Sequence, residues 1–456
     1  MTSVHAAAVM APDWLHPPAD VNALVPDFWP RSVARGADGV LTVGGIRIDD
    51  LAREFGTPAY VLDEADVRAR CREFRAGFAG ADVYYAGKAF LSKAIVRIIA
   101  SEGLSLDVCS GGELATALAA DMPAERIGLH GNNKSVDELT RAVDAGVGRI
   151  IVDSFDEIER LTAIGRARGG TRPRVLIRLT VGVEAHTHEF IATAHEDQKF
   201  GFSVASGAAM AAVDAVLSAG VLELRGFHSH IGSQIFDTGG FELATRRVLA
   251  LMATVRDTYG VDLPELDLGG GFGIAYTSQD RPSTPAELAG RIDEVIREEC
   301  AASGLPVPHL SIEPGRAIIG ASTFTLYEVG TVKDVEGIRT YVSVDGGMSD
   351  NIRSALYGAA HSATLASRRS TAPPMLARVV GKHCESGDIL VKDEFLPADT
   401  RPGDLLAVPG TGAYGRSMAS NYNHVPRPAV IAVTNGTARV IVRRETEADL
   451  LALDVG

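Results

Sequence analysis

Short runs of apolar and β-branched residues alternate with longer amphipathic stretches between about residue 55 and residue 320. Strands separated by helices in this way predict βαβ units, because two parallel strands need a long crossover connection. Eight such units within roughly 260 residues are typical of an α/β fold, the (β/α)8 barrel. The predicted strands span residues 83–86, 106–109, 127–130, 150–153, 175–179, 226–230, 266–269 and 310–313.

The starts of two predicted helices carry a further local signal. Ser135 stands three residues before Glu138, and Ser154 stands three residues before Glu157. This is the spacing of a capping box, in which the two side chains satisfy free N–H groups of the first helical turn. We therefore expect both serines to begin helices between consecutive strands.

The rest of the chain has a different pattern. After about residue 320 the helical period gives way to strand-like runs, so we expect a C-terminal β domain over residues 321–456. We expect residues 1–54 to supply a lead-in and a hairpin, residues 40–43 and 46–48 around Gly44-Gly45, that joins this domain, and residues 55–320 to form the barrel. The strands predicted in the β domain span residues 323–335, 339–345, 377–384, 404–409, 429–434 and 438–443.

The composition narrows the class of protein. Of the 456 residues 46% are hydrophobic and 22% charged, and the formal net charge is −14. An acidic surface repels phosphate backbones, so we expect no nucleic-acid partner. No apolar run approaches the roughly 20 residues of a membrane-spanning helix, and we expect no secretion signal at the N-terminus. The four cysteines show no paired spacing, so the expected location is the cytoplasm.

Unusual polar residues fall at the carboxyl ends of the predicted strands. This is the face of a (β/α)8 barrel that carries the active site. Chance would scatter such residues over both faces and the outer surface. The residues predicted at this face are Lys88, Asp107, Ser110, His130, Asn132, Asn133, Arg178, His230, Gly232, Ser233, Gln234, Gly269, Gly270, Gly271, Glu313, Gly315 and Arg316.

These residue types suit a cofactor that carries an aldehyde and a phosphate, such as pyridoxal 5′-phosphate (PLP). Lys88 lies among apolar and aromatic neighbours, where its amine can act as a nucleophile toward an aldehyde. Taken alone, a lysine at a strand end is more often a surface residue. The glycine triplet 269–271 supports the first interpretation, because bare backbone N–H groups can approach a phosphate closely.

Two further residues suit the ring of such a cofactor. An acid beside the pyridine nitrogen keeps that nitrogen protonated, and Glu313 is the candidate, with a salt bridge to Arg316 as its alternative role. His230 is placed to stack on the ring, although a lone histidine there would equally be a core residue.

The predicted β domain adds reactive groups of its own. Cys384 is flanked by charged residues, so it can donate a proton. Arg353 and Tyr357 are four residues apart and would share one face of a helical turn. Together they could hold a carboxylate, and a solvent-exposed pair is the alternative.

Five motifs occur in order along the chain, at residues 85–89, 228–234, 269–271, 313–316 and 384–388, with a sixth running from 180–188 to 199–202. Together they resemble the fold-type III PLP-dependent decarboxylases, and within them the diaminopimelate decarboxylases of actinobacterial type. The resemblance covers the chain from about residue 25 to its end. One departure is Gly87, where the family usually has a bulkier residue, but no reactive group is lost.

The resemblance implies that PLP is bound covalently to Lys88, that no metal is needed, and that the reaction converts meso-diaminopimelate to L-lysine and CO2, the last step of lysine biosynthesis. It implies a homodimer in which Cys384, Glu385 and Tyr414 enter the active site from the neighbouring subunit. Cys384 or Lys88 would return a proton to the product. Residues 182–200 would form a mobile lid that excludes water.

The resemblance also implies the remaining contacts. Glu313 pairs with the pyridine nitrogen and His230 stacks on the ring. We count Asp107, at the end of the second strand, among the cofactor-binding residues. The full set is Lys88, Asp107, His230, Ser233, Gly269, Gly270, Gly271, Glu313, Gly315, Arg316 and Tyr414. The implied substrate-binding residues are Arg316, Arg353, Tyr357, Glu385 and Tyr414.

Other functions stay open at this point. A related enzyme could decarboxylate ornithine, lysine or carboxynorspermidine. An isomerase like alanine racemase shares the barrel but has no use for residues 384–385, and a non-catalytic PLP-binding protein would lack the β domain. A substrate without a second carboxylate would leave an arginine unpaired, at a cost that favours diaminopimelate.

Overall fold

The computed structural model describes residues 11–170, 172–183 and 199–456. The chain divides into two compact units. The barrel unit consists of Arg70–Gly273 and Pro282–Ala317. The β unit consists of the chain up to Ala69 together with Ile274–Arg281 and Ile318–Gly456.

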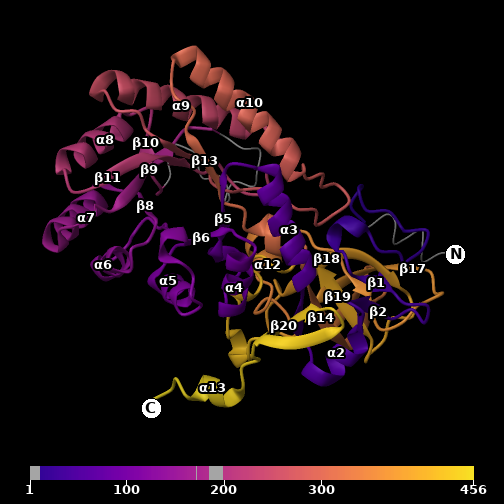
Figure 1. The fold of residues 1–456 in the computed structure, drawn as a ribbon. Coiled ribbons are helices and arrows are strands. Elements are labelled where there is room, and N and C mark those ends of the chain that lie inside the picture. Colours follow the sequence, from indigo (N-terminus) through magenta and orange to yellow (C-terminus); the bar gives the residue numbers. More distant parts are fainter. Residues whose placement is uncertain (1–10, 171, 184–198) are drawn as a thin grey trace. The chain divides into compact units, whose positions relative to one another are not determined.

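Eight parallel strands close into a barrel in the barrel unit, as the alternating pattern predicted, with helices on the outside (Figure 1). Around the barrel the order is β9-β11-β12-β13-β5-β6-β7-β8, and β8 pairs with β9 to complete the ring. The short strand β10 (Phe202–Ser203) lies beside β9. The barrel strands are β5 (Asp82–Ala86), β6 (Ser105–Val108), β7 (Ile127–Leu129), β8 (Arg149–Val152), β9 (Arg174–Thr180), β11 (Glu223–Ser229), β12 (Glu265–Asp267) and β13 (His309–Ile312).

The barrel helices begin where local caps allow. Ser135 accepts the N–H of Glu138, and the Glu138 carboxylate accepts the N–H of Ser135 at 2.9 Å, so the predicted capping box is confirmed. The outer helices are α4 (Lys93–Ser101), α5 (Gly111–Leu118), α6 (Val136–Ala145), α7 (Phe155–Arg168), α8 (Ala208–Ala219), α9 (Gly239–Tyr259) and α10 (Pro285–Ser303).

The second predicted capping box forms only in part. Ser154 accepts the N–H of Glu157, as expected. The Glu157 carboxylate, however, accepts the N–H of Asp153 at 3.1 Å and the ammonium of Lys134 at 2.7 Å. Because Lys134 is buried, it needs this anionic partner, and it holds the glutamate side chain away from the backbone N–H of Ser154.

The β unit is built around β14 (Thr323–Val335). This strand pairs in antiparallel fashion with β15 (Arg339–Val344), β19 (Leu405–Pro409) and β4 (Ala59–Asp63). β4 precedes the barrel in the chain and also pairs in parallel with β20 (Ala429–Thr434). The segment that contains β4 therefore belongs to the β sheet.

Two strands at the far end of this sheet differ from the predicted pattern. β17 (Pro374–Val380) ends earlier than expected, because residues 381–388 form a turn that returns into β18 (Ile389–Pro397). No clear sequence signal marks β18, because the polar run Lys392-Asp393-Glu394 interrupts its apolar residues. β16 (Thr364–Leu365) pairs with β19, and β21 (Thr437–Val442) pairs with β20.

The predicted N-terminal hairpin lies in the β unit. It consists of β2 (Leu41–Val43) and β3 (Ile46–Arg47), with β1 (Ala34–Arg35) beside β2. Ile48, expected at the end of the hairpin, instead begins α2 (Ile48–Phe55). Leu41 and Val43 are buried in the same apolar cluster as Phe324 and Ile431, which gives the N-terminal segment a shared core with the C-terminal strands.

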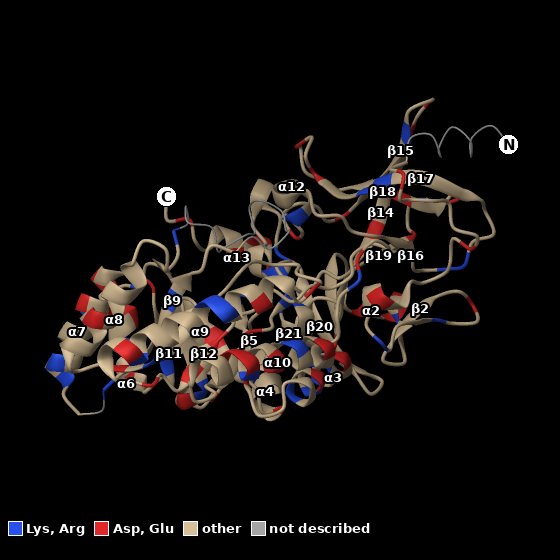
Figure 2. Ribbon diagram, turned by 90° about the horizontal axis from the view of Figure 1, so that it is seen from above, with Lys and Arg blue, Asp and Glu red and all other residues tan. Residues whose placement is uncertain are grey.

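Charged residues of both signs are interspersed over the outer helices of the barrel unit (Figure 2). Among the residues that the structure describes, no helix combines the length and apolar character needed to cross a membrane.

Candidate active site

Lys88 follows the first barrel strand directly. It lies in η2 (Gly87–Ala89), two residues beyond the end of β5, and it is exposed. Gly87 has a packing role, since a Cβ atom there would lie 2.7 Å from the carbonyl oxygen of Asp107. The unusual glycine before Lys88 thus allows this turn to lie close against β6.

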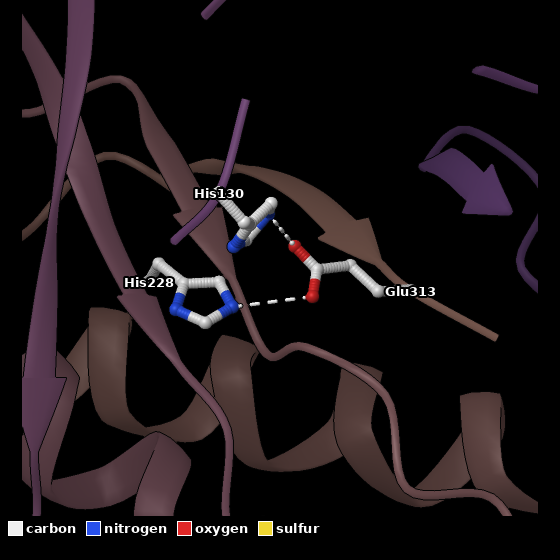
Figure 3. Close-up of side chains that lie close together, drawn as sticks. All are labelled: His130, His228 and Glu313. Atoms are coloured by element: carbon white, nitrogen blue, oxygen red, sulfur yellow. Dashed lines mark hydrogen bonds and ion pairs between the residues drawn. The ribbon is translucent and has the colours of Figure 1, made fainter. Parts of the chain in front are cut away.

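Three buried side chains meet at the carboxyl ends of the strands (Figure 3). His130 comes directly after β7, His228 lies on β11, and Glu313 comes directly after β13. The Nε2 atom of His130 lies 2.9 Å from Oε1 of Glu313, and Nε2 of His228 lies 3.2 Å from Oε2. A carboxylate only accepts, so His228 donates its Nε2–H to Glu313, whereas His130 contacts Glu313 as an ion pair without hydrogen-bond alignment.

The electrostatics of this group follow from burial and from charge. Burial alone would raise the pKa of Glu313, but the neighbouring His130 and His228 hold it well below its ordinary value. Burial would lower the pKa of His130, but the charges of Glu313 and Asp107 raise it to about 9. Burial lowers the pKa of His228, so at neutral pH Glu313 lies between one charged and one neutral imidazole.

A second ion pair lies beside the first. Arg149, at the start of β8, is buried and pairs with Asp267 at the end of β12. It also donates to the Ser311 hydroxyl at 2.9 Å, and its guanidinium carbon lies 3.7 Å from the centre of the Tyr84 ring. Asp107 lies 3.3 Å from His130. Its pKa is raised to about 6, mainly by burial and also by the negative charge of Glu313.

Sequence reasoning gave no role to His130, His228, Arg149 or Asp267. His130 was placed at the correct face by its strand end, and His228 lies within a recognised motif. Arg149 lies at the start of its strand, and the prediction considered only polar residues at the carboxyl ends of strands. It was missed for that reason. An arginine that opens a fully buried strand such as β8 is itself a signal, because such a charge requires a partner inside the barrel.

The turn after β12 approaches the turn after β13 closely. A Cβ atom at Gly270 would lie 2.2 Å from the carbonyl oxygen of Glu313, so only glycine fits there. The N–H of Gly269 donates to Asp267 at 2.7 Å, and the N–H of Gly270 donates to Nδ1 of His230 at 3.1 Å. Two of the three glycine N–H groups are therefore already engaged within the protein.

Other predicted cofactor residues gather at the same face. Arg316 is buried and donates to the hydroxyl of Ser233 at 3.0 Å. The turn before it contacts the lysine segment, since Ala86 donates its N–H to the Pro314 carbonyl at 3.2 Å. Burial lowers the pKa of His230 well below its ordinary value, and the positive charge of nearby Lys88 adds to this effect.

These residues fit a pyridoxal-type cofactor. Oε1 of Glu313 is buried and, despite its ion pair, has no well-aligned hydrogen bond among the described residues, so it can still accept one from a ring N–H. Lys88 supplies an accessible amine at the same face, and Ser233 and Arg316 supply hydrogen-bond donors for a phosphate. His130, His228 and Glu313 also offer ligand atoms within 4.8 Å of one another, a spacing that a metal ion could use.

The β unit carries the other predicted residues. Arg353 and Tyr357 share one short helix, α12 (Arg353–Tyr357), and the buried Arg353 guanidinium lies 4.7 Å from the centre of the Tyr276 ring. Cys384 and Glu385 are exposed in the turn formed by residues 381–388. The expected lid at residues 182–200 falls mostly on residues 184–198, which lie outside the described residues.

Tyr414 has a backbone conformation that few residues other than glycine adopt. Its φ angle is 61°, and Gln234, beside Ser233 in the barrel unit, has a φ of 59°. Such residues are uncommon and are concentrated at functional sites, where the surrounding structure maintains the strain. Both of these residues lie in segments that the sequence analysis assigned to the site.

Comparison with known proteins gives consistent matches. The family profile described as "Pyridoxal-dependent decarboxylase, pyridoxal binding domain" matches residues 64–320. The chain is 59% identical over 441 residues to the diaminopimelate decarboxylase of Mycobacterium tuberculosis. The alignment covers 95% of this chain and 98% of the relative. The Bacillus subtilis diaminopimelate decarboxylase is 48% identical over 421 residues, with 91% and 95% covered.

A solved structure agrees with these relatives. The diaminopimelate decarboxylase of M. jannaschii, in complex with L-lysine, superposes with a TM-score of 0.87 at 32% identity. The match covers 93% of this chain and 98% of that one.

Proposed function

The chain belongs to the pyridoxal-dependent decarboxylases, among the diaminopimelate decarboxylases, and from this premise we propose how its residues carry out the reaction. The cofactor is pyridoxal 5′-phosphate, and the reaction converts diaminopimelate to lysine and CO2. The observation that carries this conclusion is the 59% identity over 95% of the chain, with Lys88 at the end of the first barrel strand.

The barrel unit holds the cofactor in this proposal. When bound, the cofactor takes up the electron pair that remains after CO2 leaves. Lys88 would hold its aldehyde carbon, Glu313 would accept a hydrogen bond from its ring nitrogen, and His230 would stack on the ring. The residues that would bind the phosphate are Ser233, Gly269, Gly270, Gly271, Gly315 and Arg316, and Asp107 and Tyr414 would lie beside the cofactor.

Because two of the glycine N–H groups already donate within the protein, other residues must supply the stronger contacts to the phosphate. Because Gly269 and Gly270 donate to Asp267 and His230, they serve mainly to let the backbone turn closely past strand β13. Arg316 brings a full positive charge, and a charged hydrogen bond is about twice as strong as a neutral one. We therefore assign most of the phosphate affinity to Arg316 and Ser233.

The far end of the substrate decides specificity. Diaminopimelate carries a second carboxylate and a second ammonium there. Arg316, Arg353 and Tyr357 bind this carboxylate, while Glu385 binds the ammonium. Each hydrogen bond to a charged group contributes roughly 1.5–3 kcal/mol. Ornithine, which lacks the second carboxylate, leaves an arginine without an anion and is disfavoured on the order of a thousandfold.

We propose that the active unit is a homodimer. Cys384, Glu385 and Tyr414 would enter the active site of the neighbouring subunit, and the exposure of the Cys384-Glu385 turn supports this role. Cys384 or Lys88 returns the proton to the product carbon. The protein acts in the cytoplasm, a location supported by its four free thiols.

The product formed from meso-diaminopimelate tests this function. The purified chain with added PLP should release CO2 and form L-lysine from meso-diaminopimelate, with far lower rates on ornithine and on lysine. Equal or higher CO2 release from ornithine would remove the assignment of Arg353 and Glu385 to substrate recognition.

A further inference from the structure

His130 is a buried histidine to which the proposed mechanism gives no task. It is 9% exposed and comes directly after β7, with its ring edge-on to that of His228 at a centroid distance of 4.9 Å. Its Nε2 atom faces two carboxylates, Glu313 at 2.9 Å (Figure 3) and Asp107 at 3.3 Å. It therefore lies between the ring-binding acid and a second acid of the same face.

The geometry leaves Glu313 able to bind a third group. A carboxylate has about four lone-pair sites on its two oxygens. His130 faces Oε1 and His228 faces Oε2, so each oxygen retains one further site. The two imidazoles therefore fix the direction of the carboxylate without exhausting its capacity to accept a ring N–H.

Of the positive charges around Glu313, that of His130 contributes most to keeping the buried carboxylate ionised. A carboxylate buried this deeply would bind a proton if no positive charge lay nearby, and it could not then hold a ring nitrogen in its protonated form. Arg149 is 4.0 Å away and is already paired with Asp267. His130 is closer to Glu313, and the raised pKa of its imidazole keeps it charged at neutral pH, so it compensates the carboxylate.

We infer that His130 is a positioning residue for the cofactor, which keeps Glu313 ionised and directed at the ring nitrogen without itself touching the cofactor. This inference rests on the proposed function, because it requires that Glu313 pairs with the ring. On this inference, the affinity for the cofactor depends on His130, which follows β7 and acts through Glu313, which follows β13.

The test measures PLP affinity of the full chain after the cofactor has been removed and titrated back. His130→Phe should raise the Kd at least tenfold, because it removes both the charge and the N–H. His130→Gln should give an intermediate Kd, because its amide retains an N–H donor without the charge. The matched control is His309→Gln, which removes a histidine lying 3.1 Å from Asp82 at the opposite ends of the strands and should leave the Kd unchanged.

A double-mutant cycle separates a positioning role from a merely structural one. In Glu313→Gln protein, whose PLP affinity should itself be low, adding His130→Phe should change the Kd less than twofold. A further tenfold loss there would show that His130 acts independently of Glu313 and would overturn the inference. The melting temperature of each cofactor-free variant reports folding, and if His130→Phe does not fold, His130→Gln carries the same cycle.

The PLP affinity of Glu313→Gln distinguishes a failure of the proposed function from a failure of the inference about His130. If Glu313→Gln binds PLP as tightly as the unmodified chain, the assignment of Glu313 to the ring is wrong. If Glu313→Gln weakens binding while both His130 variants bind normally, the assignment of Glu313 stands and only the inference about His130 is wrong.

Discussion

The carboxylate of Asp388 accepts the backbone N–H of Met348 at 2.6 Å. Its other oxygen accepts the N–H of His383 at 2.8 Å, so one buried side chain joins the turn 381–388 to the segment that leads into α12. The His383 ring strengthens this link through Ser349 at 2.8 Å. The turn carries Cys384 and Glu385, so Asp388 holds in place the turn that would supply the ammonium-binding residue to the neighbouring subunit.

Replacing Asp388 by alanine should therefore weaken substrate binding. The buried N–H of His383 and the partly buried N–H of Met348 lose their acceptor, at up to about 1–3 kcal/mol each, and the turn that carries Glu385 loses its anchor. We expect the KM for diaminopimelate to rise at least tenfold while PLP affinity stays within twofold. Asp38→Ala, at an exposed ion pair with Arg47, is the control. A normal KM in a folded Asp388→Ala protein would show that the link does not position the substrate.

Replacing Lys88 by alanine should abolish the absorbance band of the lysine-linked cofactor. That band depends on the covalent bond between the lysine amine and the cofactor aldehyde, whereas the free aldehyde has an absorbance of its own. Lys93→Ala, a few residues further along the same segment, should retain it. An unchanged spectrum in the Lys88→Ala protein would refute the assignment of Lys88.

Replacing Arg353 by alanine should raise the KM for diaminopimelate far more than it changes PLP occupancy. Loss of a charged hydrogen bond worth roughly 1.5–3 kcal/mol corresponds to a factor of about 10–150 in affinity. Steady-state kinetics and a PLP titration of the same preparation measure the two effects. Parallel losses in both would place Arg353 outside the substrate site.

The stability of the chain should carry a pH dependence that originates at Asp350. Burial raises its pKa from 3.8 to about 7, while its oxygens accept the Tyr327 hydroxyl and the N–H of Gly347. A carboxyl group with a raised pKa binds its proton more tightly in the folded state. Its stabilising contribution is therefore complete below pH 3.8 and is lost as the pH rises through about 7.

Urea unfolding at pH 5 and pH 8 tests this dependence by comparison with Asp350→Asn, which cannot titrate. The free energy of unfolding of the unmodified chain should fall between the two pH values by on the order of 2 kcal/mol more than that of the variant. Identical changes in the two proteins would show that Asp350 does not titrate in this range.

The sequence alone determined the barrel, the separate β-rich region and the face on which the polar residues gather. These features depend on local physics: hydrophobic period distinguishes strands from helices, and serine caps mark where helices begin. The position of Lys88 directly after a buried strand was readable for the same reason. The failures were also local, since the polar residues of β18 hid a strand and Ile48 was assigned to a hairpin instead of to α2.

The tertiary structure alone decided which of these residues meet. β4 pairs with β14 and β20, which lie more than 250 residues further along the chain, and no local pattern encodes that pairing. Closure of the barrel brings His130, His228 and Glu313 together from three strand ends and supplies Arg149 with Asp267. Such contacts cannot be read from spacing, because a buried charge finds its partner through the closed sheet, and its protonation follows from the burial and the neighbouring charges that closure creates.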